Sequence, residues 1–125
     1  RRQRQMCIRD SFLIASSEWF AFVPAKEYFD EPGDHADELE TSVMMHYHPE
    51  LVNLDEAGDG NYKKFASQML NEKVAWIPRN WQKVSQDTGI GNPKKASAEK
   101  GKKYAEAVVA KYALLFEELV HKELY

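Results

Sequence analysis

The last part of the chain carries the pattern that most restricts the fold. From about Ser97 to Leu124, apolar side chains recur every three or four residues, which predicts one long amphipathic helix. At 1.5 Å per residue, such a helix is about 40 Å long. Gly101 costs about 1 kcal/mol relative to alanine inside a helix, so it indicates either close packing or a later helix start. The predicted buried stripe consists of Tyr104, Val108, Tyr112, Leu115 and Leu119.

A helix of this length needs other elements to pack against. The length of 125 residues suits one domain, and 43% apolar with 30% charged residues is typical of a soluble globular protein. The short apolar runs 12–15 and 74–77 predict two buried strands. We therefore expect an α/β fold. No apolar run approaches the roughly 20 residues of a membrane helix, and a single cysteine forms no internal disulfide, so we expect a cytoplasmic protein without a membrane partner.

The first eleven residues differ from the rest in composition. They are rich in arginine, and the segment 6–11 (Met-Cys-Ile-Arg-Asp-Ser) resembles the translation of a transposase sequencing adapter. We therefore interpret residues 1–11 as a non-native tail and residues 12–125 as the C-terminal portion of a single, truncated domain. The alternative is an ordinary basic arm. Without this segment the chain has no basic patch interleaved with aromatic residues, so no nucleic-acid partner is expected.

The stretch 33–42 concentrates the potential chemistry of the chain. Asp34 is the expected N-cap of a helix that ends before Pro49, because the residue before a proline is displaced from the α region. Further carboxylates in the first turn would favour the positive end of the helix dipole. The stretch holds one histidine and four carboxylates, namely His35, Asp34, Asp37, Glu38 and Glu40.

Helical spacing would pair one of these carboxylates with the histidine. If the helix begins at His35, then His35 and Glu38 share a face, whereas Glu40 lies about 140° further round. A histidine beside a carboxylate can serve as an acid/base pair or as part of a metal site. The alternative is an acid-rich helix start with an exposed histidine. His46 and His48 are two residues apart, which makes a poor chelating pair, and both are expected at the surface.

Two motifs resemble the creatininase (creatinine amidohydrolase) family. The stretch 33–42 (Gly-Asp-His-Ala-Asp-Glu-Leu-Glu-Thr-Ser), followed by Pro-Glu-Leu-Val at 49–52, is similar to the family's His-Ala/Gly-Gly-x-x-Glu-Thr-Ser and Pro-Asp/Glu-Leu-Val segments. The stretch 95–101 (Lys-Ala-Ser-Ala-Glu-Lys-Gly) is similar to the element that opens the family's last helix. The likeness covers about residues 12–125 but only the C-terminal half of a family chain. It implies the C-terminal part of a three-layer α/β/α fold that ends in a long amphipathic helix.

The resemblance also implies a function. Family members are metal-dependent amidohydrolases that act on a non-peptide C–N amide bond, cyclic in some substrates, in a homo-oligomer that is usually a hexamer. The metal ions would be zinc or manganese, or iron, and the partner a small-molecule amide. His35 matches the histidine that passes a proton to the leaving nitrogen, and Glu38 is a candidate base or metal ligand. Glu40 matches the invariant glutamate, and with Asp34 it would have a supporting or structural role.

Three departures from the family pattern matter. Asp37 stands where glycine is usual, and we expect it to adopt the left-handed conformation. Glu31 stands where creatininase itself has a flap tryptophan, which leaves creatinine, formamides and other amides open as substrates. The family's upstream metal-binding motifs are absent, so we expect this chain alone to be inactive and to fold poorly, with apolar faces uncovered. The alternative is a non-catalytic assembly or binding module with a creatininase-like fold.

Overall fold

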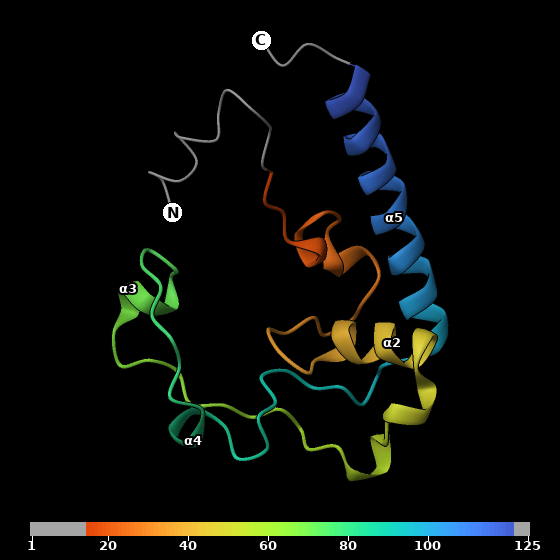
Figure 1. Ribbon diagram of the computed structural model, residues 1–125. Helices are drawn as coiled ribbons and strands as arrows, with labels where there is room; N and C mark the ends of the chain where they lie inside the picture. The colour runs from red at the N-terminus through yellow and green to blue at the C-terminus, as the bar shows by residue number, and fades with distance from the viewer. Residues whose placement is uncertain (1–14, 122–125) are drawn as a thin grey trace.

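The computed structural model describes residues 15–121 as a set of helices joined by long loops (Figure 1). The proposed tail 1–11 and most of the predicted strand 12–15 lie outside the described residues. The α-helices are α2 (Glu38–Tyr47), α3 (Gln68–Asn71), α4 (Trp81–Val84) and α5 (Ala98–His121). Single 3₁₀ turns occur at Trp19–Ala21, Ala25–Glu27, Pro49–Leu51 and Leu54–Glu56. None of the helices in this described range is long and apolar enough to cross a membrane.

The long C-terminal helix is present as predicted. It begins one residue after the expected start, and its expected end at Leu124 lies outside the described residues. The first turns of α5 pack against α2, which crosses them near their beginning (Figure 1). A Cβ atom added to Gly101 would lie 1.9 Å from the carbonyl oxygen of Ser42. Gly101 therefore marks the close packing of two helices rather than a later helix start.

The core forms where α5 meets the segment before α2. The fully buried ring of Tyr104 on α5 is surrounded by Trp19, Tyr28 and Phe29, with ring centroids 6.1, 5.3 and 5.2 Å away. The Tyr104 hydroxyl donates a hydrogen bond of 3.0 Å to the carbonyl oxygen of Phe20, and burial raises the pKa of this tyrosine. The other buried members of this core are Val23, Leu39 and Val108.

The second half of α5 is much less covered than the first half. Of the predicted stripe, Tyr104 and Val108 are buried, whereas the remaining three residues are only partly buried. On another side of the helix Phe116 and Val120 are exposed, at 59% and 74%. The predicted helical periodicity is therefore confirmed, but full burial ends at Val108. Beyond it Tyr112 still stacks on Phe22, with ring centroids 4.1 Å apart, and the described residues cover the following turns only in part (Figure 1).

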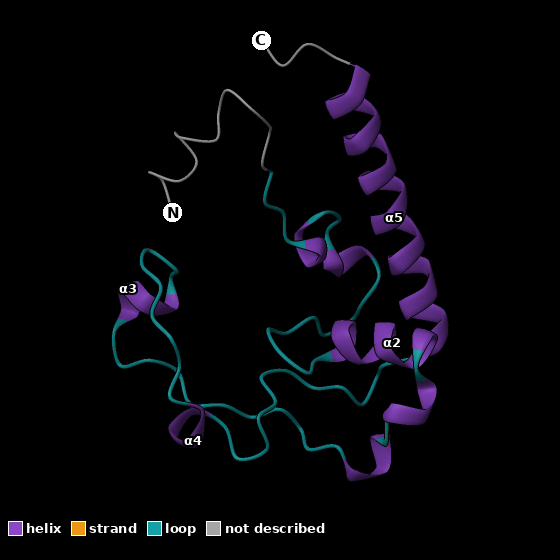
Figure 2. Ribbon diagram, viewed as in Figure 1, coloured by secondary structure: helices purple, strands orange, loops and turns teal. Residues whose placement is uncertain are grey.

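No strand occurs in residues 15–121, and the layered α/β arrangement is not seen there (Figure 2). The expected strand at 74–77 is wrong. This segment is a loop in which Val74 and Trp76 are 70% and 83% exposed, and its first amide donates to the carbonyl of Met69 in a turn. An apolar run becomes a strand only where another strand offers a hydrogen-bonding edge, and the described residues offer none here.

Isolated bridges take the place of a sheet. Residue His35 pairs with Ile90, and Tyr62 pairs with Ser85, both in antiparallel orientation. The loop that carries Ile90 also meets Gly60, whose φ of 67° is in the left-handed region. A Cβ on Gly60 would lie 1.7 Å from the carbonyl oxygen of Gly91, so only glycine permits this approach. These contacts bring the loop 85–91 against the start of α2.

Candidate active site

The start of α2 differs from the predicted one by three residues. Asp37, not Asp34, is the N-cap, and its carboxylate accepts hydrogen bonds from the backbone nitrogens of Gly33 and Glu40, the latter at 2.9 Å. Asp37 is 3% exposed, so these two bonds satisfy a buried charge. The expectation of a left-handed Asp37 is also wrong, because its φ is −87°. The left-handed residue is Ala36, with a φ of 48°.

Because α2 begins later, His35 belongs to the loop that precedes it. Its backbone exchanges hydrogen bonds of 3.0 and 2.8 Å with Ile90, which fixes the loop. Its imidazole Nδ1 lies 3.3 Å from the Oε2 of Glu40, and the same oxygen accepts a hydrogen bond of 2.7 Å from the backbone nitrogen of Ala36. The side chain of His35 is 48% exposed. The histidine therefore pairs with Glu40, and the expectation that it shares a helix face with Glu38 is wrong.

Glu38 lies fully buried between α2, α5 and the preceding loop. Its carboxylate is 2.5 Å from the Nζ of Lys100 and accepts a hydrogen bond of 2.6 Å from the backbone nitrogen of Glu31. Lys100 also lies 2.8 Å from the Oδ2 of Asp30. These contacts lower the pKa of Asp30 and raise the pKa of Lys100, in each case first through their shared hydrogen bond. A catalytic or metal-binding role for Glu38 stays a prediction, and its surroundings favour a structural role.

Two residues that the sequence did not single out lie beside His35. The guanidinium of Arg79 is 2.7 Å from the Oδ2 of Asp34, although the two residues are 45 positions apart. The same guanidinium is 5.8 Å from the centre of the Trp81 ring, and that ring is 5.2 Å from the His35 ring with an angle of 56° between their planes. Asp34 therefore holds Arg79 instead of capping α2. The sequence signal that could have indicated Arg79 and Trp81 is a cation and an aromatic residue close together in an otherwise polar loop.

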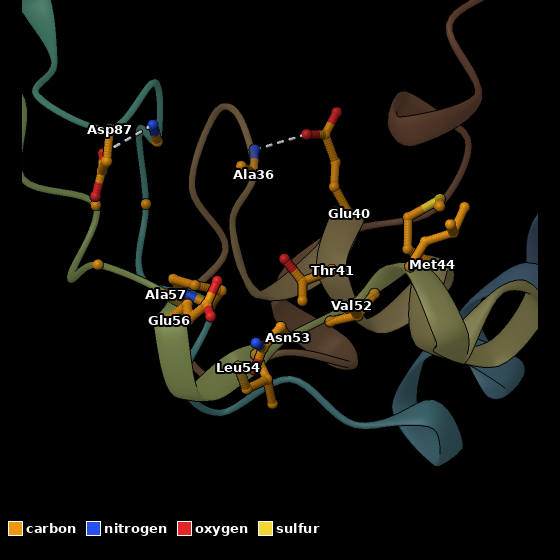
Figure 3. A pocket seen from close by; sticks show the side chains of 16 residues that line it. Ala36, Glu40, Thr41, Met44, Val52, Asn53, Leu54, Glu56, Ala57 and Asp87 are labelled. Carbon is orange, nitrogen blue, oxygen red and sulfur yellow. Dashed lines mark hydrogen bonds between the residues drawn. The ribbon is translucent and has the colours of Figure 1, made fainter.

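Cavities open on both sides of this segment. One of about 400 Å³ is lined by Glu40, Thr41 and Met44 of α2 together with the loops that carry Asn53 and Asp87. In Figure 3 the carboxylate of Glu40 stands above this cavity and accepts a hydrogen bond from the backbone amide of Ala36. A second cavity, of about 560 Å³, has Gly33, Asp34 and Arg79 in its lining. His35 itself lines neither of these two cavities, but its neighbours in the chain do, Ala36 the first and Asp34 the second.

The described residues do not form a metal centre by themselves. Among residues 15–121, no group of three or more His, Cys, Asp or Glu side chains lies close enough to hold a metal ion. His35 and Glu40 supply two candidate ligands at most. His48 is exposed, as expected, and its Nδ1 lies 3.2 Å from the Oε1 of Glu50, whereas His46 is only partly exposed.

The comparison with protein families identifies the chain. The family model described as Creatininase: Creatinine amidohydrolase matches residues 1–116, so the chain belongs to the creatininase family. The match begins at residue 1 and therefore includes the segment 1–11. A foreign origin of that segment stays a prediction.

One solved structure is similar over nearly the whole chain. It is a crystal structure of a protein from Bacteroides fragilis, provisionally described as a creatinine amidohydrolase, with 58% sequence identity and a TM-score of 0.88. The similarity covers 99% of this chain and 49% of that one, so the chain spans about half the length of the solved structure. A comparison with curated proteins finds no match.

Proposed function

We propose that this chain forms part of an amidohydrolase that hydrolyses the C–N bond of a small, non-peptide amide, with His35 as the proton carrier. The observation that carries the proposal is the 3.3 Å contact between the Nδ1 of His35 and the Oε2 of Glu40, at a half-exposed site flanked by cavities. Membership of the creatininase family and the similarity to the Bacteroides fragilis protein support this function.

The pair has the properties that amide hydrolysis requires. The nitrogen of an amide leaves readily only after it receives a proton, and an imidazole is suited to transfer that proton near neutral pH. When Nδ1 donates to Glu40, the other ring nitrogen is the one that can exchange a proton with the substrate. The carboxylate then stabilises the imidazolium that forms when the ring takes up a proton.

Glu40 is itself held in place before any substrate binds. It is the third residue of α2, and its side chain folds back to accept the amide of Ala36. The backbone amide of Glu40 in turn donates to Asp37. These bonds fix the carboxylate and the loop that carries His35 in one arrangement, so little reorganisation is needed during proton transfer.

A divalent metal ion, zinc, manganese or iron, remains part of the proposal for the intact protein. Its ligands would have to include residues outside the described range, because residues 15–121 contain no suitable cluster. Assembly into a homo-oligomer such as a hexamer is likewise proposed on the family resemblance. We assign no step of the reaction to the metal ion.

The proposal is tested by substitution of the pair in the intact protein that carries this chain. We expect hydrolysis of creatinine, of a formamide or of both, measured as product release, and no hydrolysis of a dipeptide. His35→Asn should lower kcat by roughly 10²- to 10⁴-fold, the usual contribution of general acid/base catalysis. His48→Asn is a matched control, because His48 also pairs with a glutamate at similar distance but on the exposed surface, and it should leave kcat unchanged.

Two results would contradict the proposal. Full activity of His35→Asn would remove the histidine from the reaction. Absence of turnover of both creatinine and the formamide by the intact, folded wild-type protein would instead favour the non-catalytic assembly or binding module.

A further inference from the structure

Arg79 is the least exposed residue of a loop that otherwise faces solvent. The loop lies in the segment that carries α3 and α4, which extends away from α2 and α5 (Figure 1). Every other residue from 71 to 80 is exposed, Trp76 at 83%, whereas the side chain of Arg79 is only 30% exposed. Arginine normally lies at the surface and tryptophan inside, and here the order is reversed. A specific interaction therefore draws the guanidinium inward.

Two contacts hold this guanidinium, and both lead to His35. It lies 2.7 Å from the Oδ2 of Asp34, the residue before His35, and 5.8 Å from the centre of the Trp81 ring. The Trp81 ring in turn lies 5.2 Å from the ring of His35. A cation is attracted both by a carboxylate and by the electron-rich face of an indole. Four side chains from two segments of the chain therefore form a closed circuit around one arginine.

The two segments of this circuit differ in how firmly their backbone is held. The backbone nitrogens of Asp34 and His35 both donate to the carbonyl of Ile90, at 2.8 and 3.0 Å. Trp81, by contrast, begins a helix of four residues whose N-cap forms no side-chain hydrogen bond. The ion pair of Arg79 with the firmly held segment therefore ties the start of α4, and with it the indole, to the loop before α2.

We propose that Arg79 is a positioning residue for His35. By joining Trp81 to Asp34, it holds the imidazole in the orientation that the contact with Glu40 requires. Glu40 meets the ring at a single atom, Nδ1, at 3.3 Å. A ring held at one point can still turn, whereas an indole packed against it removes that freedom. This inference rests on the proposed function, because it explains how the same site keeps its proton carrier aligned.

The first test compares kcat with KM in the intact protein, for creatinine or for the formamide. Arg79→Met keeps the length of the side chain and removes its charge. We expect kcat to fall roughly 3- to 10-fold while KM changes by less than about twofold, because alignment of the imidazole matters most in the transition state. Arg79→Lys retains a cation that can meet both Asp34 and the indole, so it should recover most of the wild-type kcat.

Lys95→Met is the matched control for these variants. Lys95 forms an ion pair of 2.6 Å with Glu31, which belongs to the same loop before α2 but lies outside the circuit of Arg79. We expect this variant to leave kcat unchanged. Wild-type kinetics of Arg79→Met, a rise in KM at constant kcat, or an Arg79→Lys variant as slow as Arg79→Met would overturn the inference.

The second test follows the imidazole itself and needs no turnover. Diethyl pyrocarbonate acylates neutral imidazole nitrogens, and mass spectrometry of the peptides measures the rate at each histidine. We expect Arg79→Met to raise the rate at His35 at least about twofold, because the ring is less restrained. His48 is the internal reference, since its Nδ1 also lies 3.2 Å from a glutamate, and its rate should not change. Equal rates at His35 in wild type and Arg79→Met would overturn the inference. A raised rate in a protein that hydrolyses neither amide would contradict the proposed function and leave this inference standing.

Discussion

The Oγ of Ser42 accepts a hydrogen bond of 3.0 Å from the backbone nitrogen of Ser97. This contact joins the two motifs that resemble the creatininase family, 55 residues apart in the sequence. Two further contacts cross the same interface. Glu38 meets Lys100, and the carbonyl of Ser42 lies where a side chain of Gly101 would be. The second motif therefore packs against the buried side of the first motif.

The first motif thus has two sides with different tasks. Glu38 and Ser42 are both fully buried and face the beginning of α5. His35 and Glu40 are 48% and 38% exposed and contact each other. A single short stretch therefore supplies both a packing surface and the candidate catalytic pair, and substitutions on the two sides should have separable effects.

Gly101→Ala should destabilise the protein. Alanine normally stabilises a helix interior by about 1 kcal/mol relative to glycine. Here the new Cβ would lie 1.9 Å from a backbone oxygen of Ser42, so α2 and α5 must move apart, at a cost of about 1–3 kcal/mol. The expected net effect is a lower free energy of unfolding, measured by urea denaturation.

Gly58→Ala is the matched control for that substitution. A Cβ on Gly58 would lie 1.8 Å from Oδ2 of Asp87, which is the end of a side chain that can rotate away. We expect little change in the urea midpoint. Equal destabilisation by both substitutions would show that close helix packing is not the cause.

Ser42→Ala should destabilise the protein by about 1–3 kcal/mol, because the amide of Ser97 loses its acceptor in a partly buried place. Ser67→Ala provides the comparison. Ser67 precedes α3, but its side chain forms no capping bond there, so its loss should be nearly neutral. Thermal melts of the two variants measure the difference, and equal melting temperatures would refute the prediction.

Glu38→Gln and Glu40→Gln should differ in which property they change, Tm in the first case and kcat/KM in the second. Glu38→Gln removes the buried charge opposite Lys100, so we expect a lower Tm with unchanged kcat/KM in the intact protein. Glu40→Gln removes the charge beside His35 on a partly exposed side chain, so we expect a nearly unchanged Tm and a kcat/KM that falls at least about tenfold. A loss of kcat/KM in well-folded Glu38→Gln would instead support the catalytic role expected from the sequence.

Asp30 should make stability depend on pH at the acid end. Its hydrogen bond to Lys100 holds the pKa of Asp30 below the usual value of 3.8. The folded state therefore binds this proton less readily than the unfolded state, and the resulting stabilisation is present above about pH 4 and is lost as pH falls through the lowered pKa. We expect Asp30→Asn to lower Tm at pH 7, and the difference from wild type to shrink as the pH falls below about 4. Asp55→Asn, at an exposed position, serves as control, and a constant difference between Asp30→Asn and wild type over this range would contradict the prediction.

The elements that the sequence predicted well are those defined by local pattern. The repeat of apolar residues placed α5 within one residue of its observed start, and Pro49 marked the end of α2 correctly. These features depend on spacing of a few residues, which periodicity reports directly.

The predictions that failed depended on competition between neighbouring residues or on distant ones. Asp34 and Asp37 are both good N-caps by residue type, and only the loop geometry decides that Asp37 reaches the free amides. The two possible caps lie three residues apart, and this offset in the start of α2 determines whether His35 meets Glu38 or Glu40. The loop 74–77 has the composition of a strand but lacks a partner edge among the described residues.

By itself the sequence determined the long helix, the chemistry-bearing stretch and the likeness to the creatininase family. Only the tertiary structure decided which carboxylate faces His35, which one is buried against Lys100, and that Trp81 and Arg79 join the site. The physical reason is that helical periodicity is a local property of the chain. Pairing of charges and rings across 45 or more residues follows instead from how loops close and helices pack, which no short spacing encodes.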